Sequence, residues 1–153
     1  MTTVQSAARP FVLSIHPTYV ERILAGNKTI ELRRRFPSLV APGIALIYAT
    51  APVQAIVASV QVPIVETLSL TALWRRRGRD AAVTRKEFDD YFDGTQSGCA
   101  LVLRDVVRFP SPIHLTVLAH RFEFSPPQSY CYWKASLDEL TKTHGRVKAA
   151  SRH

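Results

Sequence analysis

The sequence predicts an α+β domain in which five or six short strands form a small barrel with helices added around it. Three observations lead to this prediction. Short apolar runs, several with strand-like alternation, are separated by glycine and proline. Apolar residues recur at helical spacing near the start, in the middle and near the end of the chain. The 153 residues are 46% hydrophobic and 21% charged, which is typical of one globular domain.

We predict that this domain spans residues 11–145. Residues 1–10 lack the apolar core of a signal peptide, and we expect them to form a short flexible lead. Residues 146–153 are small and basic, and we expect them to form a mobile tail.

The first third of the domain has a strand–helix–strand pattern. The apolar residues 11–15 predict a strand, and Pro17 occupies the favoured first position of the helix that follows. That helix carries an apolar stripe of Val20, Ile23 and Leu24. Gly26 ends the helix, because glycine tolerates the left-handed backbone conformation that is common there.

Residues 29–33 form the next predicted strand, and they separate apolar from charged side chains. Strand alternation places Ile30 and Leu32 on one face and Glu31 and Arg33 on the other. Lys28 lies in the preceding turn, so alternation does not fix its direction. We predict that these three charged groups meet and hold a polar ligand. The alternative is an ordinary turn followed by a solvated strand face, which would contribute little to stability.

The middle of the domain contains a hairpin and a helical insertion. After a loop over residues 36–43, the apolar runs 44–49 and 55–62 predict paired strands, the first of them buried on both faces or closing a barrel. Two helices follow. The first carries Leu70, Leu73 and Trp74 at helical spacing, and the second begins with a capping box at Thr84.

The last part of the domain returns to strands and ends in a helix. Residues 98–107 predict one long strand, and Pro110 and Pro112 bound a turn. Residues 115–124 predict one or two short strands, because Phe122 and Phe124 alternate with charged residues. Residues 137–144 predict a C-terminal helix that begins with its own capping box.

The charged strand carries a recognisable motif. Gly26, Lys28, Glu31 and Arg33 match G-x-K-x-x-E-x-R, the signature of the ASCH family in the PUA-like superfamily, and residues 11–62 resemble that family. Residues 126–130 are similar to a segment near the C-terminus of some ASCH-type proteins. The resemblance implies a PUA-like barrel with a cleft beside it that holds RNA or a modified nucleoside.

The resemblance gives the charged residues specific roles in binding. Lys28 and Arg33 would meet phosphates or base acceptors, and Glu31 would accept from an amino edge. A second group of residues is expected to line the same cleft: Ser14, His16, Tyr48, Gln128, Ser129 and Tyr130.

Basic residues outside the motif favour a polyanionic partner. The formal net charge is +8 and the isoelectric point is about 10.0. We predict that nucleic acid is the partner, RNA rather than DNA, and that two clusters contact its backbone: Arg34, Arg35, Arg75, Arg76, Arg77, Arg79, Arg85 and Lys86. The later cluster has an alternative role as a docking surface for a protein.

An enzymatic function is the main alternative to binding. One ASCH branch resembles amidohydrolases that act on acylated cytidine with a lysine, a threonine and a glutamate. The lysine corresponds to Lys28, but Glu31 stands at the threonine position, and the third residue falls near Arg79 or Asp80. Ribonuclease activity is also known among ASCH proteins. In the amidohydrolase, a Lys28–Glu31 pair would act as base and electrophile. Lys28 and Glu31 are also the catalytic candidates for a ribonuclease, but the sequence indicates no mechanism for it.

Several other classes of protein are not favoured by the sequence. Two cysteines without C-x-x-C spacing form neither a disulfide framework nor a zinc site, and five scattered histidines show no i, i+4 pairing, so we predict no metal or cofactor. The cysteine content fits a reducing cytoplasm. No apolar run approaches the roughly 20 residues of a membrane-spanning helix.

Overall fold

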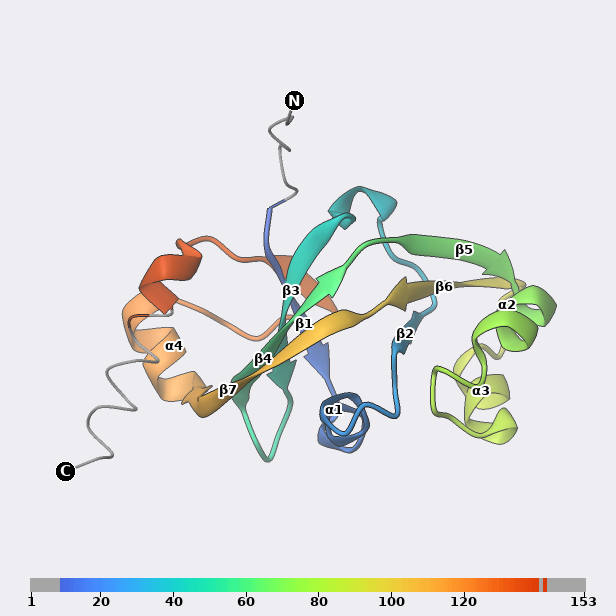
Figure 1. Ribbon diagram of the computed structural model, residues 1–153, viewed down its shortest axis with the longest axis horizontal. Helices are drawn as coiled ribbons and strands as arrows, with labels where there is room; N and C mark the ends of the chain where they lie inside the picture. The colour runs from blue at the N-terminus through green and yellow to red at the C-terminus, as the bar shows by residue number, and fades with distance from the viewer. Residues whose placement is uncertain (1–8, 141, 143–153) are drawn as a thin grey trace.

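Eight strands form two sheets in the computed structural model, which describes residues 9–140 and 142 (Figure 1). The larger sheet has the strand order β7-β4-β3-β1-β8, with β1 (Phe11–Ile15), β3 (Gly43–Ala49), β4 (Ala55–Val62), β7 (Arg104–His114) and β8 (Tyr130–Tyr132). The smaller sheet has the order β2-β6-β5, with β2 (Ile30–Arg33), β5 (Val65–Ser69) and β6 (Ser97–Val102). The helices are α1 (Pro17–Leu24), the 3-10 turn η1 (Ser38–Val40), α2 (Leu70–Arg77), α3 (Arg85–Tyr91) and α4 (Leu115–Phe122).

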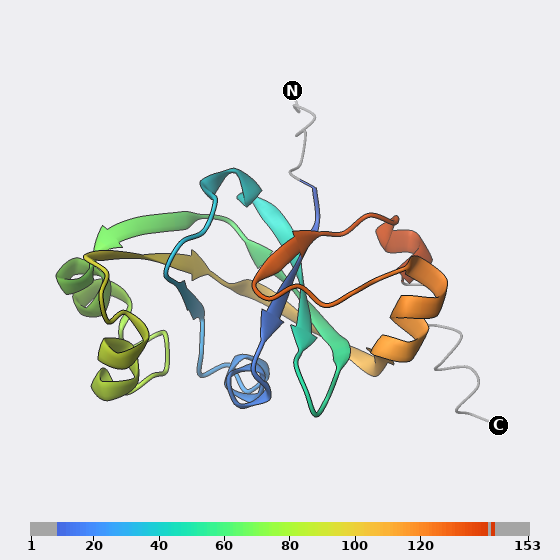
Figure 2. The ribbon, with the colours of Figure 1, turned by 180° about the vertical axis from the view of Figure 1, so that it is seen from behind.

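A long two-stranded ribbon joins the two sheets. Strands β4 and β7 pair in the larger sheet, and the chain segments continuous with them, β5 and β6, pair in the smaller one. Pro63 and Leu103 lie where the ribbon passes from one sheet to the other. The ribbon carries α2 and α3 to one end of the molecule, and α4 lies at the opposite end in both views (Figures 1 and 2).

Alternation along the strands builds the hydrophobic cores. Phe11, Leu13 and Ile15 of β1 join the core that includes α1, whereas Val12 faces a second core under α4. A third core lies beneath α2 and α3 and receives Ile30 and Leu32 of β2. The larger sheet is therefore covered on both faces. The apolar face of β2 packs into the third core, which leaves its charged side chains on the opposite face.

The predicted mixed α+β class and several of its elements are confirmed. Helix α1 begins with Pro17, and Gly26 has a φ of +84°, the left-handed conformation expected at its end. The capping box of α3 is complete, with Thr84 and Glu87 each bonded to the other's backbone N–H. Strand β3 is buried along most of its length, as the prediction of a strand covered on both faces required.

The prediction of strands over residues 115–124 was wrong, because most of this segment is α4. Leu115, Leu118 and Phe122 lie three and four positions apart and face the second core, which is a helical spacing. His114 caps the helix by accepting a hydrogen bond from the backbone N–H of Thr116. The alternation of Phe122 with Phe124 was misleading, because Glu123 ends the helix between them with a φ of 53°.

Three other strand predictions need correction. Residues 98–107 form parts of two strands, since the chain leaves β6 and enters β7 at Leu103. Pro110 and Pro112 lie within β7 instead of bounding a turn. Proline lacks the N–H that a central strand needs, but β7 is an edge strand with irregular pairing to β4. Strands β5 and β8 were not predicted, so the described strands outnumber the five or six that we expected.

The expected closed barrel is also not observed. The strands form two separate sheets joined by the ribbon. The predicted C-terminal helix has helical backbone at 137–140 and 142, and the rest of it and the tail 146–153 lie outside the described residues. Within the predicted lead, the Pro10 carbonyl accepts a hydrogen bond from the Trp133 N–H. None of the described helices is long and apolar enough to cross a membrane.

Candidate functional site

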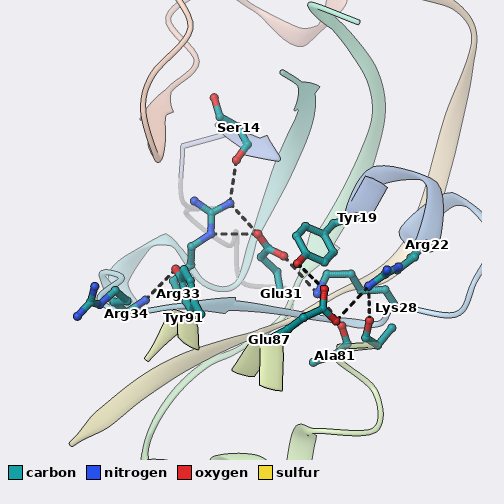
Figure 3. A network of polar contacts seen from close by, with 11 residues as sticks. Ser14, Tyr19, Arg22, Lys28, Glu31, Arg33, Arg34, Ala81, Glu87 and Tyr91 are labelled. Atoms are coloured by element: carbon teal, nitrogen blue, oxygen red, sulfur yellow. Dashed lines mark hydrogen bonds and ion pairs between the residues drawn. The ribbon is translucent and has the colours of Figure 1, made fainter. Parts of the chain in front are cut away.

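A cavity of about 300 Å³ opens where β1, β2, α1 and α3 meet. Lys28 and Glu31 lie in its wall together with Arg33, and the rings of Tyr19, Phe88 and Tyr91 form its aromatic sides. We call it the Lys28–Glu31 cavity. Its lining comes from residues that are far apart in the sequence, such as Ser14, Glu31 and Glu87 in Figure 3.

The charged face of β2 is buried instead of solvated. Glu31 and Arg33 are each 8% exposed and Lys28 is 3% exposed. Strand β2 is an edge strand of the smaller sheet, and its charged face is turned toward the larger sheet. The alternative of a solvated strand face is therefore wrong, and three ionised groups are held in a place where unpaired charge would be costly.

Arg33 uses all of its donors within the protein. Its Nε and Nη2 donate to Glu31 Oε2 at 3.1 and 2.8 Å, and Nη2 also donates to the Ser14 carbonyl at 3.0 Å. Its Nη1 donates to the carbonyl and the hydroxyl of Ser129 at 3.3 and 3.0 Å. A guanidinium has five N–H groups, so none is left for a ligand. Arg33 fastens β2 to β1 and to the segment before β8.

Lys28 and Glu31 keep hydrogen-bonding capacity that the protein does not use. Lys28 Nζ donates to the Ala81 carbonyl at 2.7 Å and lies 3.5 Å from Glu31 Oε1. Its third N–H has no oxygen partner among the described residues, and Nζ lies 5.3 Å from the centroid of the Tyr19 ring. Among the residues that the structure describes, Lys28 is the only charged partner of Glu31 Oε1. A donor and an acceptor thus stand side by side.

Burial changes the acidity of Lys28. Loss of water around the ammonium lowers its pKa from the ordinary value of 10.5, and the nearby Glu31 carboxylate opposes that shift only in part. A lysine with a lowered pKa in a cavity exchanges its proton more readily than a surface lysine, a property that is common in functional sites.

Glu87 supplies a second carboxylate to the cavity, a role that we did not predict from the sequence. It accepts a hydrogen bond from the Tyr19 hydroxyl at 3.2 Å, and Arg22 lies 4.0 Å away. A hydrogen bond from the backbone of Thr84 lowers the pKa of Glu87, so it is charged near neutral pH. Its place in the α3 capping box accounts fully for a glutamate there. The role of Glu87 in the cavity depends on its contact with Tyr19, 68 residues away, which only the folded structure shows.

The aromatic walls were likewise not predicted as site residues. Burial raises the pKa of both Tyr19 and Tyr91, so the two phenols keep their protons at neutral pH. The Tyr91 oxygen accepts the backbone N–H of Arg34 at 3.2 Å. Phe88 is 2% exposed and also lines the cavity.

The second group of predicted residues divides between the cavity and its surroundings. Ser14, His16 and Gln128 line the cavity. Of these, His16 is exposed and its Nδ1 caps α1 by accepting from Thr18 N at 3.1 Å. The other three do not line it. Tyr48 packs on Phe124 in the second core, Tyr130 packs on Phe36, and Ser129 acts through Arg33.

The predicted backbone-binding residues differ in whether they already have partners. Four of them are engaged within the protein: Arg34 with the Asp93 carbonyl, Arg77 with Glu66, Arg85 with Asp89 and Lys86 with Asp90. The other four have no carboxylate partner among residues 9–140 and 142: Arg35, Arg75, Arg76 and Arg79. In the same described residues, no three His, Cys, Asp or Glu side chains gather closely enough to hold a metal ion.

A PUA-like fold with a buried lysine–glutamate–arginine motif defines a class of protein, and comparison with known proteins identifies the family. Residues 13–109 match the ASCH domain model, and the chain belongs to the ASCH domain family. It is 36% identical over 119 residues to a Zymomonas mobilis protein named ASCH domain-containing ribonuclease, covering 77% of this chain and 80% of that protein.

Solved structures agree with this assignment. The crystal structure of ASCH from Zymomonas mobilis is similar to the chain with a TM-score of 0.78 and 33% identity, over 88% of this chain and 93% of that one. A serine-to-alanine variant of the Zymomonas protein gives a TM-score of 0.82 and 31% identity, over 90% of this chain and 97% of the other.

Proposed function

We propose that this ASCH domain binds RNA by taking one base of a single strand into the Lys28–Glu31 cavity. The observation that carries the proposal is the unused donor of Lys28 beside the unused acceptor of Glu31, in a cavity with aromatic walls. A base has the matching features, namely a flat ring and an edge on which donors and acceptors adjoin. Single-stranded RNA is commonly recognised through such edges and through stacking on aromatic side chains.

The balance of charge in the cavity favours a base over a phosphate as its occupant. Lys28 and Arg33 are matched by Glu31 and Glu87, with His16 at the rim. A phosphate placed there would meet two carboxylates, and it would find the guanidinium already saturated. An uncharged base with a hydrogen-bonding edge avoids both costs. RNA is favoured over DNA because a relative with 36% identity is named a ribonuclease.

Binding of short RNAs to a matched pair of variants tests the proposal. Lys28→Met removes the ammonium and conserves volume, and Lys134→Met makes the same change at an exposed position outside the cavity. A hydrogen bond to a charged group contributes about 1.5–3 kcal/mol, so we expect Lys28→Met to weaken binding about 10- to 150-fold. Fluorescence anisotropy with a labelled oligoribonucleotide, its DNA counterpart and competing free modified nucleosides measures this. Equal affinities of the two variants would refute the proposal.

RNA cleavage is a second candidate function, favoured by the name of the Zymomonas relative. Glu31 would take the proton of the ribose 2′-hydroxyl, and the 2′-oxygen would attack the adjacent phosphorus. Lys28 would give a proton to the departing 5′-oxygen, leaving a 2′,3′-cyclic phosphate and a 5′-hydroxyl. The lowered pKa of Lys28 suits a proton donor.

The products and one substrate analogue distinguish cleavage from binding alone. The cleavage mechanism predicts a cyclic-phosphate product by mass spectrometry and no reaction when the attacking 2′-hydroxyl is replaced by hydrogen. Glu31→Gln is expected to abolish turnover and to retain the RNA complex. Intact RNA after prolonged incubation with the wild-type protein would leave binding as the whole function.

A further inference from the structure

A second hollow lies beside the Lys28–Glu31 cavity, at the end of the molecule that carries α2 and α3. It has a volume of about 710 Å³ and is lined by Trp74, Arg75, Arg76, Gly78, Arg79, Asp80 and Val83. We call it the arginine hollow. Val83 lines both this hollow and the cavity, so the two are separated only by the link between α2 and α3.

Some arginines near the hollow form ion pairs with carboxylates of the protein, and others do not. Arg77, in the same run, is held by Glu66 at 2.8 Å, and Arg85 is held by Asp89 at 3.0 Å. Arg75, Arg76 and Arg79 are exposed and have no carboxylate partner among residues 9–140 and 142, and all three line the arginine hollow. With Asp80 as the only carboxylate in its lining, the hollow has an excess of positive charge.

The link between the two sites is held firmly in place. The Asp80 carbonyl accepts the backbone N–H groups of Thr29 and Ile30 at 2.8 and 3.1 Å, and the Ala81 carbonyl accepts Lys28 Nζ. The backbone that carries Arg79 is thus attached directly to the residues of the cavity. Gly78 adds to this, since a Cβ there would lie 2.5 Å from the Trp74 carbonyl oxygen. Gly78 has helical backbone angles, so it is the close approach to Trp74 that leaves no room for a side chain.

Trp74 anchors this region and is not free to stack on a base. Its ring packs edge-on against Phe88, with centroids 5.1 Å apart, and the Arg85 guanidinium lies 5.2 Å from the ring centroid. The hollow therefore offers charge and little aromatic surface. Its chemistry matches a phosphate, whereas the chemistry of the cavity matches a base.

We infer that Arg75, Arg76 and Arg79 form a phosphate-binding subsite for the same RNA strand whose base occupies the cavity. This inference rests on the proposed function. It makes the ligand a strand of several nucleotides and not a free nucleoside, because one nucleoside fills the cavity without reaching the arginines. The backbone leaves the cavity over Val83, and its neighbouring phosphates meet the arginines.

Two charge-matched triple variants test the subsite. One combines Arg75→Gln, Arg76→Gln and Arg79→Gln. The control combines Arg104→Gln, Arg108→Gln and Arg121→Gln, exposed residues of β7 and α4 away from α2 and α3 (Figure 1). Each triple lowers the formal net charge of +8 by three. Affinities are measured for a nucleoside, its 5′-monophosphate and single-stranded RNAs of increasing length, by NMR titration for the small ligands and by anisotropy for the RNAs.

Wild-type protein is expected to bind RNAs of several nucleotides much more tightly than the nucleoside. The triple variant of Arg75, Arg76 and Arg79, which we call the α2 triple, is expected to lose about tenfold or more of that gain at an ionic strength of about 0.15 M and to keep the affinity for the nucleoside. The control triple is expected to stay within about threefold of wild type for every ligand, because long-range attraction is largely screened by salt. Circular dichroism verifies that both triples remain folded.

Other outcomes overturn the inference in distinguishable ways. Equal losses in the two triples would mean general attraction by net charge. Full RNA affinity in the α2 triple, with the Lys28→Met defect retained, would overturn the subsite but leave the proposed function intact and free the arginines for an acidic protein partner. No RNA binding by the wild-type protein would refute the proposed function and, with it, the subsite.

Discussion

The Lys28–Glu31 cavity and the arginine hollow lie side by side but differ in the balance and the burial of their charged groups. In the cavity, two cations are matched by two carboxylates. Lys28, Glu31 and Arg33 are buried and connected by hydrogen bonds and an ion pair, and Glu87 is partly exposed. In the hollow, three exposed arginines face a single carboxylate. Buried charges discriminate between ligands by hydrogen-bond pattern, because any unmatched group there is costly. Exposed charges attract any polyanion, and salt screens them. One region is therefore suited to selectivity and the other to affinity.

Residues of the same motif also differ in whether they have hydrogen-bonding groups left for a ligand. Lys28, Glu31 and Arg33 lie together in the sequence, yet Arg33 has no donor left and the other two do. Arg33 was predicted to bind the ligand, and its geometry favours a positioning role instead. It holds the Glu31 carboxylate in place, and it connects Ser14 and Ser129 to β2.

The largest expected effect is the loss of stability in Arg33→Ala. The change removes the hydrogen bonds of Arg33 to Glu31, Ser14 and Ser129 and leaves Lys28 as the only charged partner of Glu31 among the described residues. Breaking a buried ion pair in this way costs about 3–5 kcal/mol. Arg35→Ala, at an exposed position two residues later, should change the free energy of unfolding by less than about 0.5 kcal/mol. Urea denaturation measures both.

A triple variant shows whether the lost stability comes from the buried charges that remain. Lys28→Met, Glu31→Met and Arg33→Met together remove the whole charged network, and we expect the triple variant to be more stable than Arg33→Ala, since apolar replacement of buried charged groups is often tolerated. If Arg33→Ala unfolded at the same urea concentration as Arg35→Ala, the buried network would have no structural role.

The pH dependence of RNA binding is the next largest effect. Lys28 has a third N–H for the base only as an ammonium, because a neutral amine has two and the contacts with Ala81 and Glu31 take both. Burial lowers the pKa of Lys28 below the ordinary 10.5. Affinity is therefore complete below the lowered pKa and decreases as the pH rises through it, at a lower pH than an exposed lysine would require. Lys28→Met should lack this transition. Anisotropy titrations at a series of alkaline pH values measure it, and identical pH profiles for the two proteins would contradict the assignment.

The salt dependence of binding should change in the α2 triple variant. Each phosphate contact on a single strand contributes about 0.7 to the slope of log affinity against log salt, so losing three contacts should reduce the slope by about two. The control triple on β7 and α4 should retain the wild-type slope. Parallel lines for the wild type and the α2 triple would remove the arginine hollow from the interface.

The motif strand could be predicted from sequence because its information is local. Alternation placed Glu31 and Arg33 on one face, and the motif linked them to Lys28. The same holds for α1 with Pro17 and Gly26, and for the α3 capping box. These features depend on residues within a few positions of one another.

Features that depend on distant contacts could not be predicted in the same way. Glu87 reaches the cavity through packing of α3 against α1, and the capping box already explained its presence. The saturation of Arg33 requires Ser129, 96 residues away. The missing barrel closure follows from the passage of the ribbon between two sheets near Leu103, within a run that predicts one uninterrupted strand. Burial of Tyr48 under Phe124 depends on where α4 ends.

The most direct test of the central claim compares wild-type protein and Lys28→Met across a range of salt concentrations with one labelled oligoribonucleotide. If the buried lysine contacts a base, the two plots of log affinity against log salt should be parallel, with Lys28→Met displaced about 10- to 150-fold toward weaker binding. Plots that converge at high salt, with a slope lower by about 0.7 for the variant, would mean that Lys28 contacts a phosphate. That result, or superimposed plots, would contradict the division between a base-binding cavity and a phosphate-binding hollow.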